Sequence, residues 1–240
     1  MNKRDVKVFE SPYEVAKNLS IELSSLIKRY SGQGRKFNLA ISGGSTPKIL
    51  FKYLLDTYGD ELDWHSLNVY WVDERCVAPD SPESNFGVAN DVLLRNILLP
   101  EKNIHRIKGE ADPNEEVKRY RELIIENVAP DNNIPRFDYL ILGMGDDGHT
   151  ASLFPGTNDI NSKDKVCIVT EKPDTKQKRI SLTLETINNA KRIRFMVTGK
   201  EKIQILKEIF DENTNSDKYP ASHVNNHDMI WLIDEDAAAK

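Results

Sequence analysis

Short apolar runs alternate along this chain with segments whose apolar residues recur at helical spacing, and this alternation limits the fold more than any other feature. The apolar runs predict strands, and the segments between them predict helices. Parallel strands need a long crossover, usually a helix, whereas antiparallel strands can be joined by a tight turn. The sequence therefore predicts an α/β fold with a largely parallel sheet flanked by helices.

The expected strands are 37–42, 67–72, 137–143, 166–170, 192–198 and 229–233. The expected helices are 12–30, 46–54, 85–98, 115–128 and 200–210. The first helix has the clearest end signals, because Ser11 and Glu14 have the spacing of a capping box and Gly32 interrupts the pattern. The residues from Asp234 onward are interpreted as a polar tail that contains alanines.

Composition narrows the class of protein. No internal repeat or linker-like stretch occurs, so residues 1–240 are interpreted as one domain. The chain has 33 Lys and Arg against 38 Asp and Glu, a formal net charge of −5 at pH 7. That sign argues against nucleic acid or an anionic membrane as a partner, although a local pocket can still bind a small anion. We expect a small-molecule substrate and a monomer or small homo-oligomer.

Cysteine usage and the apolar runs indicate the compartment. Cys76 and Cys167 lie far apart and outside any CxxC pair, which argues against a disulfide framework or a cysteine zinc cage. The N-terminus, MNKRDVKVFE, has no apolar stretch of signal-peptide length, and no later run approaches a membrane span. We expect a cytoplasmic protein. His223 and His227 have zinc-like spacing, but the residues around them favour a loop without metal.

Four unusual segments each follow directly on an apolar strand. The run LAIS leads into 43–47, VYWV into 73–75, LILG into 144–149, and FMVT into 199–202. In a parallel sheet these points lie at the carboxyl edge of the strands, where α/β proteins bind ligands. The four loops therefore predict one shared site.

The first of these loops has features of an anion site. Gly43 and Gly44 allow backbone N–H groups to approach a ligand, and Ser45 and Thr46 start a helix whose N-terminus favours negative charge. A phosphate fits this description, whereas the missing GK[ST] argues against a nucleoside triphosphate. The alternative is a plain tight turn in which Thr46 caps the helix.

The segment 143–149 formally matches GxGxxG, but it reaches Pro155 too soon for the long helix of a dinucleotide site. The functional interpretation is a glycine-permitted loop that presents Asp146, Asp147 and His149 to a ligand. Histidine exchanges protons near neutral pH, and a neighbouring carboxylate can orient its ring. The alternative is a histidine that is simply hydrogen-bonded within a turn.

Cationic side chains at the same edge are candidate ligands for an anion. Arg75 can bind anionic oxygens, and Asp73 beside it can bind hydroxyls or polarise a group. Arg179 and Lys202 are further candidate phosphate ligands. Each of these charges could instead face solvent, which is the commoner place for Lys and Arg.

These residues lie in motifs that resemble the glucosamine-6-phosphate isomerase/6-phosphogluconolactonase family. The motifs run in order from about Phe37 to the C-terminus: LAISGGSTPK, VYWVDERCVAPDSPESNFG, FDYLILGMGDDGHTASLFPG, KRISLTLETINNA, VTGKEK, YPASHV and MIWLIDEDAA. The resemblance implies a Rossmann-like fold, similar to glucosamine-6-phosphate deaminases and ribose-5-phosphate isomerases. It also implies hydrolysis of a phosphorylated gluconolactone in the oxidative pentose phosphate pathway, without a metal or an organic cofactor.

The resemblance also implies roles for individual residues. His149 corresponds to the general base with Asp147 beside it, while the 43–46 loop, Arg179 and Lys202 correspond to the phosphate ligands. Arg75 matches a substrate-contacting arginine. The oxyanion of the attacked carbonyl could be stabilised by backbone N–H groups of Gly145 to Gly148 or by the Arg75 side chain.

One departure separates the two branches of the family. The deaminases continue after the histidine into an Asn-Glu-Pro segment whose glutamate takes part in their chemistry, whereas this chain has 152–156, SLFPG, without an acid. Lactone hydrolysis needs only an activated water and oxyanion stabilisation. The alternatives are a phosphosugar isomerase or deaminase and, with less support, a non-catalytic phosphosugar-sensing domain.

Overall fold

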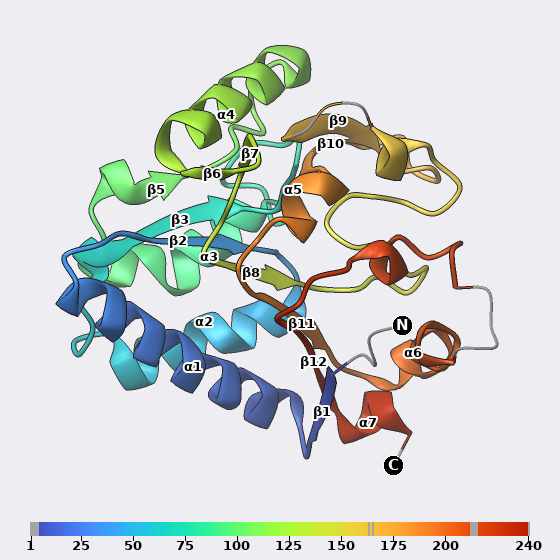
Figure 1. Cartoon of the computed structure of the whole chain (residues 1–240), viewed down its shortest axis with the longest axis horizontal. Coiled ribbons are helices and arrows are strands. Elements are labelled where there is room, and N and C mark those ends of the chain that lie inside the picture. The colour runs from blue at the N-terminus through green and yellow to red at the C-terminus, as the bar shows by residue number, and fades with distance from the viewer. Residues whose placement is uncertain (1–4, 163, 165, 212–215, 240) are drawn as a thin grey trace.

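The computed structural model describes residues 5–162, 164, 166–211 and 216–239, so the first four residues of the charged N-terminal segment lie outside it. Its centre is a seven-stranded sheet whose registered pairs are all parallel (Figure 1). In spatial order the strands are β1 (Asp5–Phe9), β12 (Met229–Asp234), β11 (Ile193–Val197), β8 (Tyr139–Leu142), β2 (Phe37–Ile41), β3 (Leu67–Trp71) and β5 (Ile104–His105). The predicted α/β fold is confirmed.

Helices cover both faces of this sheet. The α-helices are α1 (Pro12–Gly32), α2 (Ser45–Tyr58), α3 (Asn85–Val92), α4 (Pro113–Asn127), α5 (Leu184–Asn188), α6 (Ile203–Phe210) and α7 (Glu235–Ala238). The 3₁₀ turns are η1 (Trp64–Ser66), η2 (Leu94–Asn96), η3 (Glu101–Asn103), η4 (Asp159–Asn161), η5 (Lys200–Lys202) and η6 (Pro220–His223). Figure 1 shows α1 and α2 on one side of the sheet and α4 on the other. No helix in the described ranges is both long and apolar enough to span a membrane.

The core follows from the sequence pattern. Helix α1 buries Val15, Leu19 and Leu23 on one face. Its start is as predicted, because the Ser11 hydroxyl accepts the backbone N–H of Glu14 at 3.3 Å. Strands β3 and β8 are buried throughout, as expected for parallel strands covered on both faces.

A second, antiparallel sheet was not predicted. It consists of β4 (Asp73–Arg75), β10 (Lys178–Leu182) and β9 (Cys167–Glu171), and a two-stranded ladder joins β6 (Pro130–Asp131) to β7 (Ile134–Pro135). The run 166–170 therefore does form a strand, but outside the parallel sheet. Strands β4 and β10 escaped prediction because β4 is entirely charged and β10 begins with two cationic residues, so neither gives a clear apolar run.

One helix prediction and the predicted polar tail need correction. The predicted helix 85–98 ends at Val92, and the Asn96 side-chain amide then donates to the carbonyls of Asp91 and Val92 at 3.2 and 3.3 Å. A side chain thus satisfies carbonyl groups that a continuing helix would have used. The predicted polar tail is also wrong, because residues 235–238 form α7 with Asp234 as the N-cap.

Asp234 joins this last helix to the loop after β11. Its carboxylate is 2% exposed and accepts the backbone N–H groups of Ala237 at 2.8 Å and Gly199 at 3.0 Å. Gly199 opens the turn that carries Lys202, so Asp234 stabilises one of the four loops expected at the site.

Replacing Asp234 by Ala should lower the free energy of unfolding by about 1–3 kcal/mol, because two backbone N–H groups lose a buried acceptor. Urea unfolding of Asp234→Ala measures this loss. The matched control is Asp236→Ala on the same helix; the Asp236 side chain is 59% exposed and pairs with exposed Lys200. Equal stability of the two variants would contradict the prediction.

Candidate active site

The strand order reverses between β2 and β8, and a pocket lies at the carboxyl ends of the strands there. Its volume is about 370 Å³. All four predicted loops reach it, together with residues from α3 and β10. Its lining includes Ser42, Gly43, Gly44, Ser45, Thr46, Asp73, Arg75, Asn85, Gly145, Asp146, His149, Arg179, Thr198, Glu201 and Lys202. The four loops therefore meet at one pocket, as predicted.

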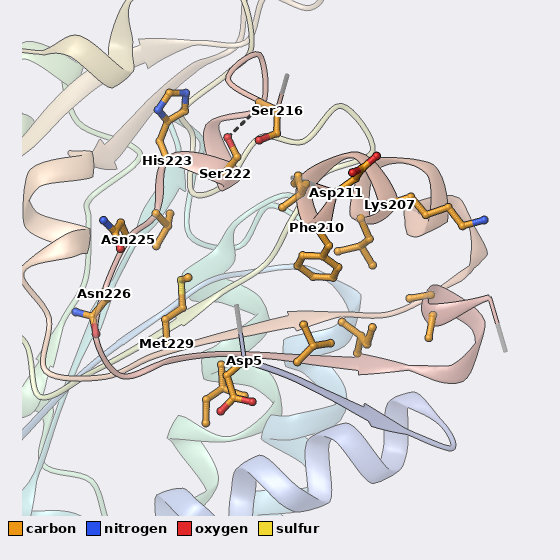
Figure 2. Close-up of a pocket in the computed structure, with 18 of the residues that line it drawn as sticks. Asp5, Lys207, Phe210, Asp211, Ser216, Ser222, His223, Asn225, Asn226 and Met229 are labelled. Atoms are coloured by element: carbon orange, nitrogen blue, oxygen red, sulfur yellow. Dashed lines mark hydrogen bonds between the residues drawn. The ribbon is translucent and has the colours of Figure 1, made fainter. Parts of the chain in front are cut away.

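A larger hollow of about 1610 Å³ lies between α6, β12 and the segment that follows residue 216 (Figure 2). The predicted site residues do not line it. Its polar groups bond locally, since the Ser222 hydroxyl donates to the Ser216 carbonyl at 2.7 Å and His223 Nε2 lies 2.7 Å from the Asp217 carbonyl. Across the described part of the chain, no three His, Cys, Asp or Glu side chains are grouped to hold a metal ion. The smaller pocket, which is lined by His149 and by the cationic side chains of Arg75, Arg179 and Lys202, is the candidate site.

The glycine loop opens the N-terminus of α2 toward this pocket. Gly44 is the N-cap residue with φ 110°, and within the described residues no side chain caps the helix. Thr46 is therefore not the cap, and its hydroxyl lies 2.9 Å from that of Thr198 instead. The N–H groups of the first helical turn are left available to an anion.

Gly43 is also needed for packing. A Cβ atom at this position would lie 1.7 Å from Asn85 Oδ1. No larger residue fits there unless Asn85 moves.

Asp147 and His149 form a close pair on the loop after β8. His149 Nδ1 lies 2.5 Å from Asp147 Oδ1, which also accepts the His149 backbone N–H at 3.0 Å. The imidazole passes so near Gly145 that a Cβ there would lie 2.1 Å from His149 Cε1. The loop closes on itself, because the Gly145 N–H donates to the His149 carbonyl and the Gly148 N–H donates to the Gly145 carbonyl.

This pair changes the acidity of the carboxyl group. Burial acts to raise the pKa of Asp147, but the hydrogen bonds from the side chain and backbone of His149 outweigh it. The pKa of Asp147 is lowered from 3.8 to about 2. Asp147 is therefore ionised at neutral pH and can orient the imidazole ring.

Arg75 is held by a turn that sequence reasoning missed. Its Nη1 donates to the Glu83 carbonyl and to Asn85 Oδ1, both at 2.7 Å. Glu74, which is 2% exposed, accepts the backbone N–H groups of Asn85 at 2.8 Å and Phe86 at 2.7 Å. Burial raises the pKa of Glu74, and these hydrogen bonds oppose that rise. No local sequence pattern indicates that Asn85 holds the Arg75 side chain, because Asn85 lies ten residues from Arg75 in the chain.

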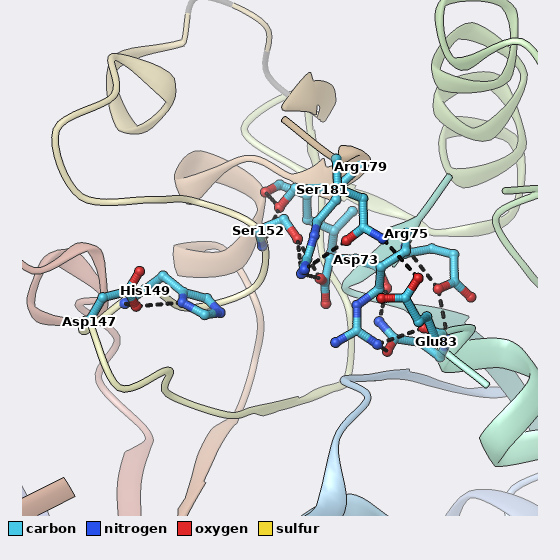
Figure 3. Close-up of polar contacts among 12 residues, drawn as sticks. Asp73, Arg75, Glu83, Asp147, His149, Ser152, Arg179 and Ser181 are labelled. Atoms are coloured by element: carbon cyan, nitrogen blue, oxygen red, sulfur yellow. Dashed lines mark hydrogen bonds and ion pairs between the residues drawn. The ribbon is translucent and has the colours of Figure 1, made fainter. Parts of the chain in front are cut away.

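Arg179 lies directly opposite Arg75 in the β10–β4 ladder. Its Nη1 is 3.4 Å from the Ser152 hydroxyl and 4.0 Å from Asp73 Oδ2. The Ser152 hydroxyl donates to Asp73 at 2.6 Å, and Figure 3 shows these groups as one set of polar contacts near the Asp147–His149 pair. Burial lowers the pKa of Arg179; Asp73 opposes this effect, whereas Arg75 adds to it. Because Arg75 and Arg179 lie beside one buried carboxylate, Asp73, this side of the pocket has an excess of positive charge and forms a cationic wall.

Lys202, in η5, forms an ion pair with Asp146 of the loop after β8. The lysine side chain is only 12% exposed, whereas that of Asp146 is 75% exposed. An anionic substrate would therefore compete with Asp146 for a largely buried ammonium group. Every predicted site residue except Asp147 lines the pocket. Asp147 does not line it but contacts His149, which does.

Comparison with known proteins agrees with this geometry. Residues 10–231 match the family model of glucosamine-6-phosphate isomerases/6-phosphogluconolactonase. A 6-phosphogluconolactonase of Aggregatibacter actinomycetemcomitans is 41% identical over 212 residues, which cover 87% of this chain and 89% of that protein. The crystal structure of a devB protein superposes with a TM-score of 0.91 and 39% identity, covering 98% of both chains.

The chain belongs to the glucosamine-6-phosphate isomerase/6-phosphogluconolactonase family. A monomeric glucosamine-6-phosphate deaminase shares the fold, with a TM-score of 0.80 at 23% identity over 98% of this chain and 99% of that one. The expected likeness in fold to these deaminases is confirmed.

The carboxyl group of Asp147 should titrate near pH 2, and in His149→Ala its pKa should rise because the ring hydrogen bond is lost while the backbone N–H remains. Since the folded pKa lies below 3.8, the stabilisation by ionised Asp147 is complete above about pH 4 and is lost as the pH falls toward 2. Carbon NMR of labelled aspartate carboxyls measures both titrations, with His223→Ala as the control. An unchanged Asp147 midpoint in His149→Ala would contradict this account.

Proposed function

We propose that this protein hydrolyses 6-phospho-D-glucono-1,5-lactone to 6-phospho-D-gluconate, the lactonase step of the oxidative pentose phosphate pathway, in the cytoplasm. The observation that supports it is one pocket that joins the His149–Asp147 pair to Arg179, Lys202 and the open N-terminus of α2. The lactonase named among the relatives, at 41% identity over most of both chains, supports the same reaction.

The substrate phosphate binds at the glycine loop. The first turn of α2 supplies backbone N–H groups and a favourable dipole, while Arg179 and Lys202 supply positive charge. Asp146 leaves Lys202 when the phosphate arrives. The phosphate contacts then orient the lactone ring, because they replace free rotation in solution by one bound position.

His149 acts as the general base. With its proton on Nδ1, the imidazole donates a hydrogen bond to Asp147. The lone pair of Nε2 is then free to accept a proton from a water molecule. As the water oxygen bonds to the lactone carbonyl carbon, its proton passes to Nε2, and ionised Asp147 stabilises the imidazolium. When the ring C–O bond breaks, the same proton passes to the departing ring oxygen, which becomes the C5 hydroxyl of the product.

The Arg75 side chain is the better supported of the two oxyanion donors. Within the loop, the N–H groups of Gly145 and Gly148 already donate to carbonyls of the same loop. Among the described residues, the Arg75 side chain makes two hydrogen bonds, both from Nη1, and its partners Glu83 and Asn85 hold the guanidinium at the pocket wall. Positive charge placed in advance stabilises a developing oxyanion without rearrangement.

The isomerase or deaminase alternative has less support. The residue that precedes Pro155 is Phe154, whose ring centroid lies 4.9 Å from that of His149. The apolar Phe154 side chain therefore lies beside His149, at the position where opening of the sugar ring and loss of the amine would need an acid.

The decisive assay is hydrolysis of freshly generated 6-phosphogluconolactone by chelator-treated protein, corrected for the spontaneous rate. His149→Ala should lower kcat by about 10²- to 10⁴-fold, the usual contribution of a general base. His65→Ala, at an exposed histidine, is the control. Wild-type activity in His149→Ala would refute the base, and no rate above background in the wild type would refute the function.

Arg179→Ala should raise KM for the phosphorylated lactone by about 10- to 100-fold, because a charge-assisted contact to the phosphate is lost. KM for unphosphorylated gluconolactone should stay unchanged. Lys178→Ala, on the exposed start of the same strand, is the matched control. Steady-state kinetics on both lactones distinguishes loss of a phosphate ligand, which affects one substrate, from a folding defect, which affects both.

A further inference from the structure

A buried phenylalanine contacts both functional parts of the pocket. Phe154 is 1% exposed and lies five residues after His149. Its ring centroid is 4.9 Å from that of the His149 imidazole, with an angle of 47° between the ring planes. The guanidinium carbon of Arg179 lies 5.5 Å from the same ring centroid. One side chain that cannot reach the substrate therefore touches both the base and a phosphate ligand.

The imidazole needs such a contact. Asp147 holds Nδ1 at 2.5 Å, which fixes one atom of the ring, while the His149 side chain remains 24% exposed. The ring is joined to the chain through Cβ and is held by Asp147 at Nδ1, so the motion left to it is a tilt of the ring plane. The ring of Phe154 occupies the neighbouring space and limits this tilt, so that Nε2 keeps one direction.

Arg179 needs the contact with Phe154 for a different reason. Its Nη2 donates to Gln177 Oε1 at 3.1 Å, but its Nε is buried without a hydrogen-bond partner among the described residues. The contacts of its Nη1 to Ser152 and Asp73 are long, at 3.4 and 4.0 Å. A second arginine, Arg75, faces it across the ladder. The π face of Phe154 attracts the guanidinium and holds its plane, which compensates for these weak contacts.

We propose that Phe154 is a positioning residue that holds the phosphate-binding Arg179 and the base His149 at a constant separation. The phosphate then sets the distance from the lactone carbonyl to the water that His149 activates. The proposal rests on the proposed function. It predicts that removal of the aromatic ring affects both KM and kcat, through two separate contacts.

Phe154→Leu keeps an apolar side chain but removes the aromatic ring. It should lower kcat on the phosphorylated lactone about 3- to 10-fold and raise KM by a similar factor, the usual range for these ring contacts. On unphosphorylated gluconolactone, kcat should fall while KM stays unchanged, because Arg179 has no phosphate to bind. Phe154→Tyr keeps the ring and should restore most of both parameters.

The matched control is Phe137→Leu, the same change at a fully buried ring that contacts Tyr70 in the core. It should lower stability without altering KM or kcat. Wild-type kinetics in Phe154→Leu, or an equal change of both lactones' KM values, would overturn the positioning role. So would the same kinetic change in Phe137→Leu.

Calorimetry separates this inference from the proposed function. Phe154→Leu should weaken binding of 6-phosphogluconate about 3- to 10-fold and leave binding of gluconate unchanged. A wild type that binds 6-phosphogluconate without hydrolysing the lactone would overturn the function, while the weaker binding by Phe154→Leu would still support the contact to Arg179. Hydrolysis by the wild type with unchanged binding by Phe154→Leu would overturn the inference alone.

Discussion

The parallel pairing of β2 with β8 in the middle of the sheet is the constraint on which the site depends. Leu39 pairs with Tyr139 and Ala40 with Leu140, and the Ser42 hydroxyl donates to the Ile141 carbonyl at 2.9 Å just beyond them. Because the strand order reverses at this pair, the loops that leave the two strands diverge and open a crevice. The open N-terminus of α2 and the His149–Asp147 pair are thereby brought to one place.

Buried carboxylates help to hold the loops around this crevice. Glu74 accepts backbone N–H groups at the start of α3, Asp73 accepts the Ser152 hydroxyl, and Asp234 accepts N–H groups of Gly199 and Ala237. A buried charge is costly unless hydrogen bonds satisfy it, so each carboxylate favours one conformation of the backbone around it. The loops are positioned by polar contacts while their cationic side chains remain turned toward the pocket.

The fold alone does not choose the reaction, since a deaminase shares it at a TM-score of 0.80. In the proposed function, the side chains around His149 carry that choice. An ionised Asp147 on one side and the apolar Phe154 on the other suit a histidine that accepts a proton from water. The cationic wall of Arg75 and Arg179 suits a substrate that is anionic at one end and develops negative charge at the other.

By itself, the sequence determined the α/β class, the four loops at one sheet edge and a histidine with carboxylates beside it in one of those loops. These follow from periodicity, parallel geometry and neighbouring residues, all of which are local information, whereas the choice of Asp147 as the partner of His149 came from the family resemblance. Tertiary structure alone decided the antiparallel sheet that sets Arg179 opposite Arg75, the anchoring of Arg75 by Asn85, and the two contacts of Phe154. The pairing of Arg179 with Arg75 and the contact of Arg179 with Phe154 join residues far apart in the chain, while Asn85 and His149 reach their partners only because the intervening loops fold back, so no local pattern could name these contacts.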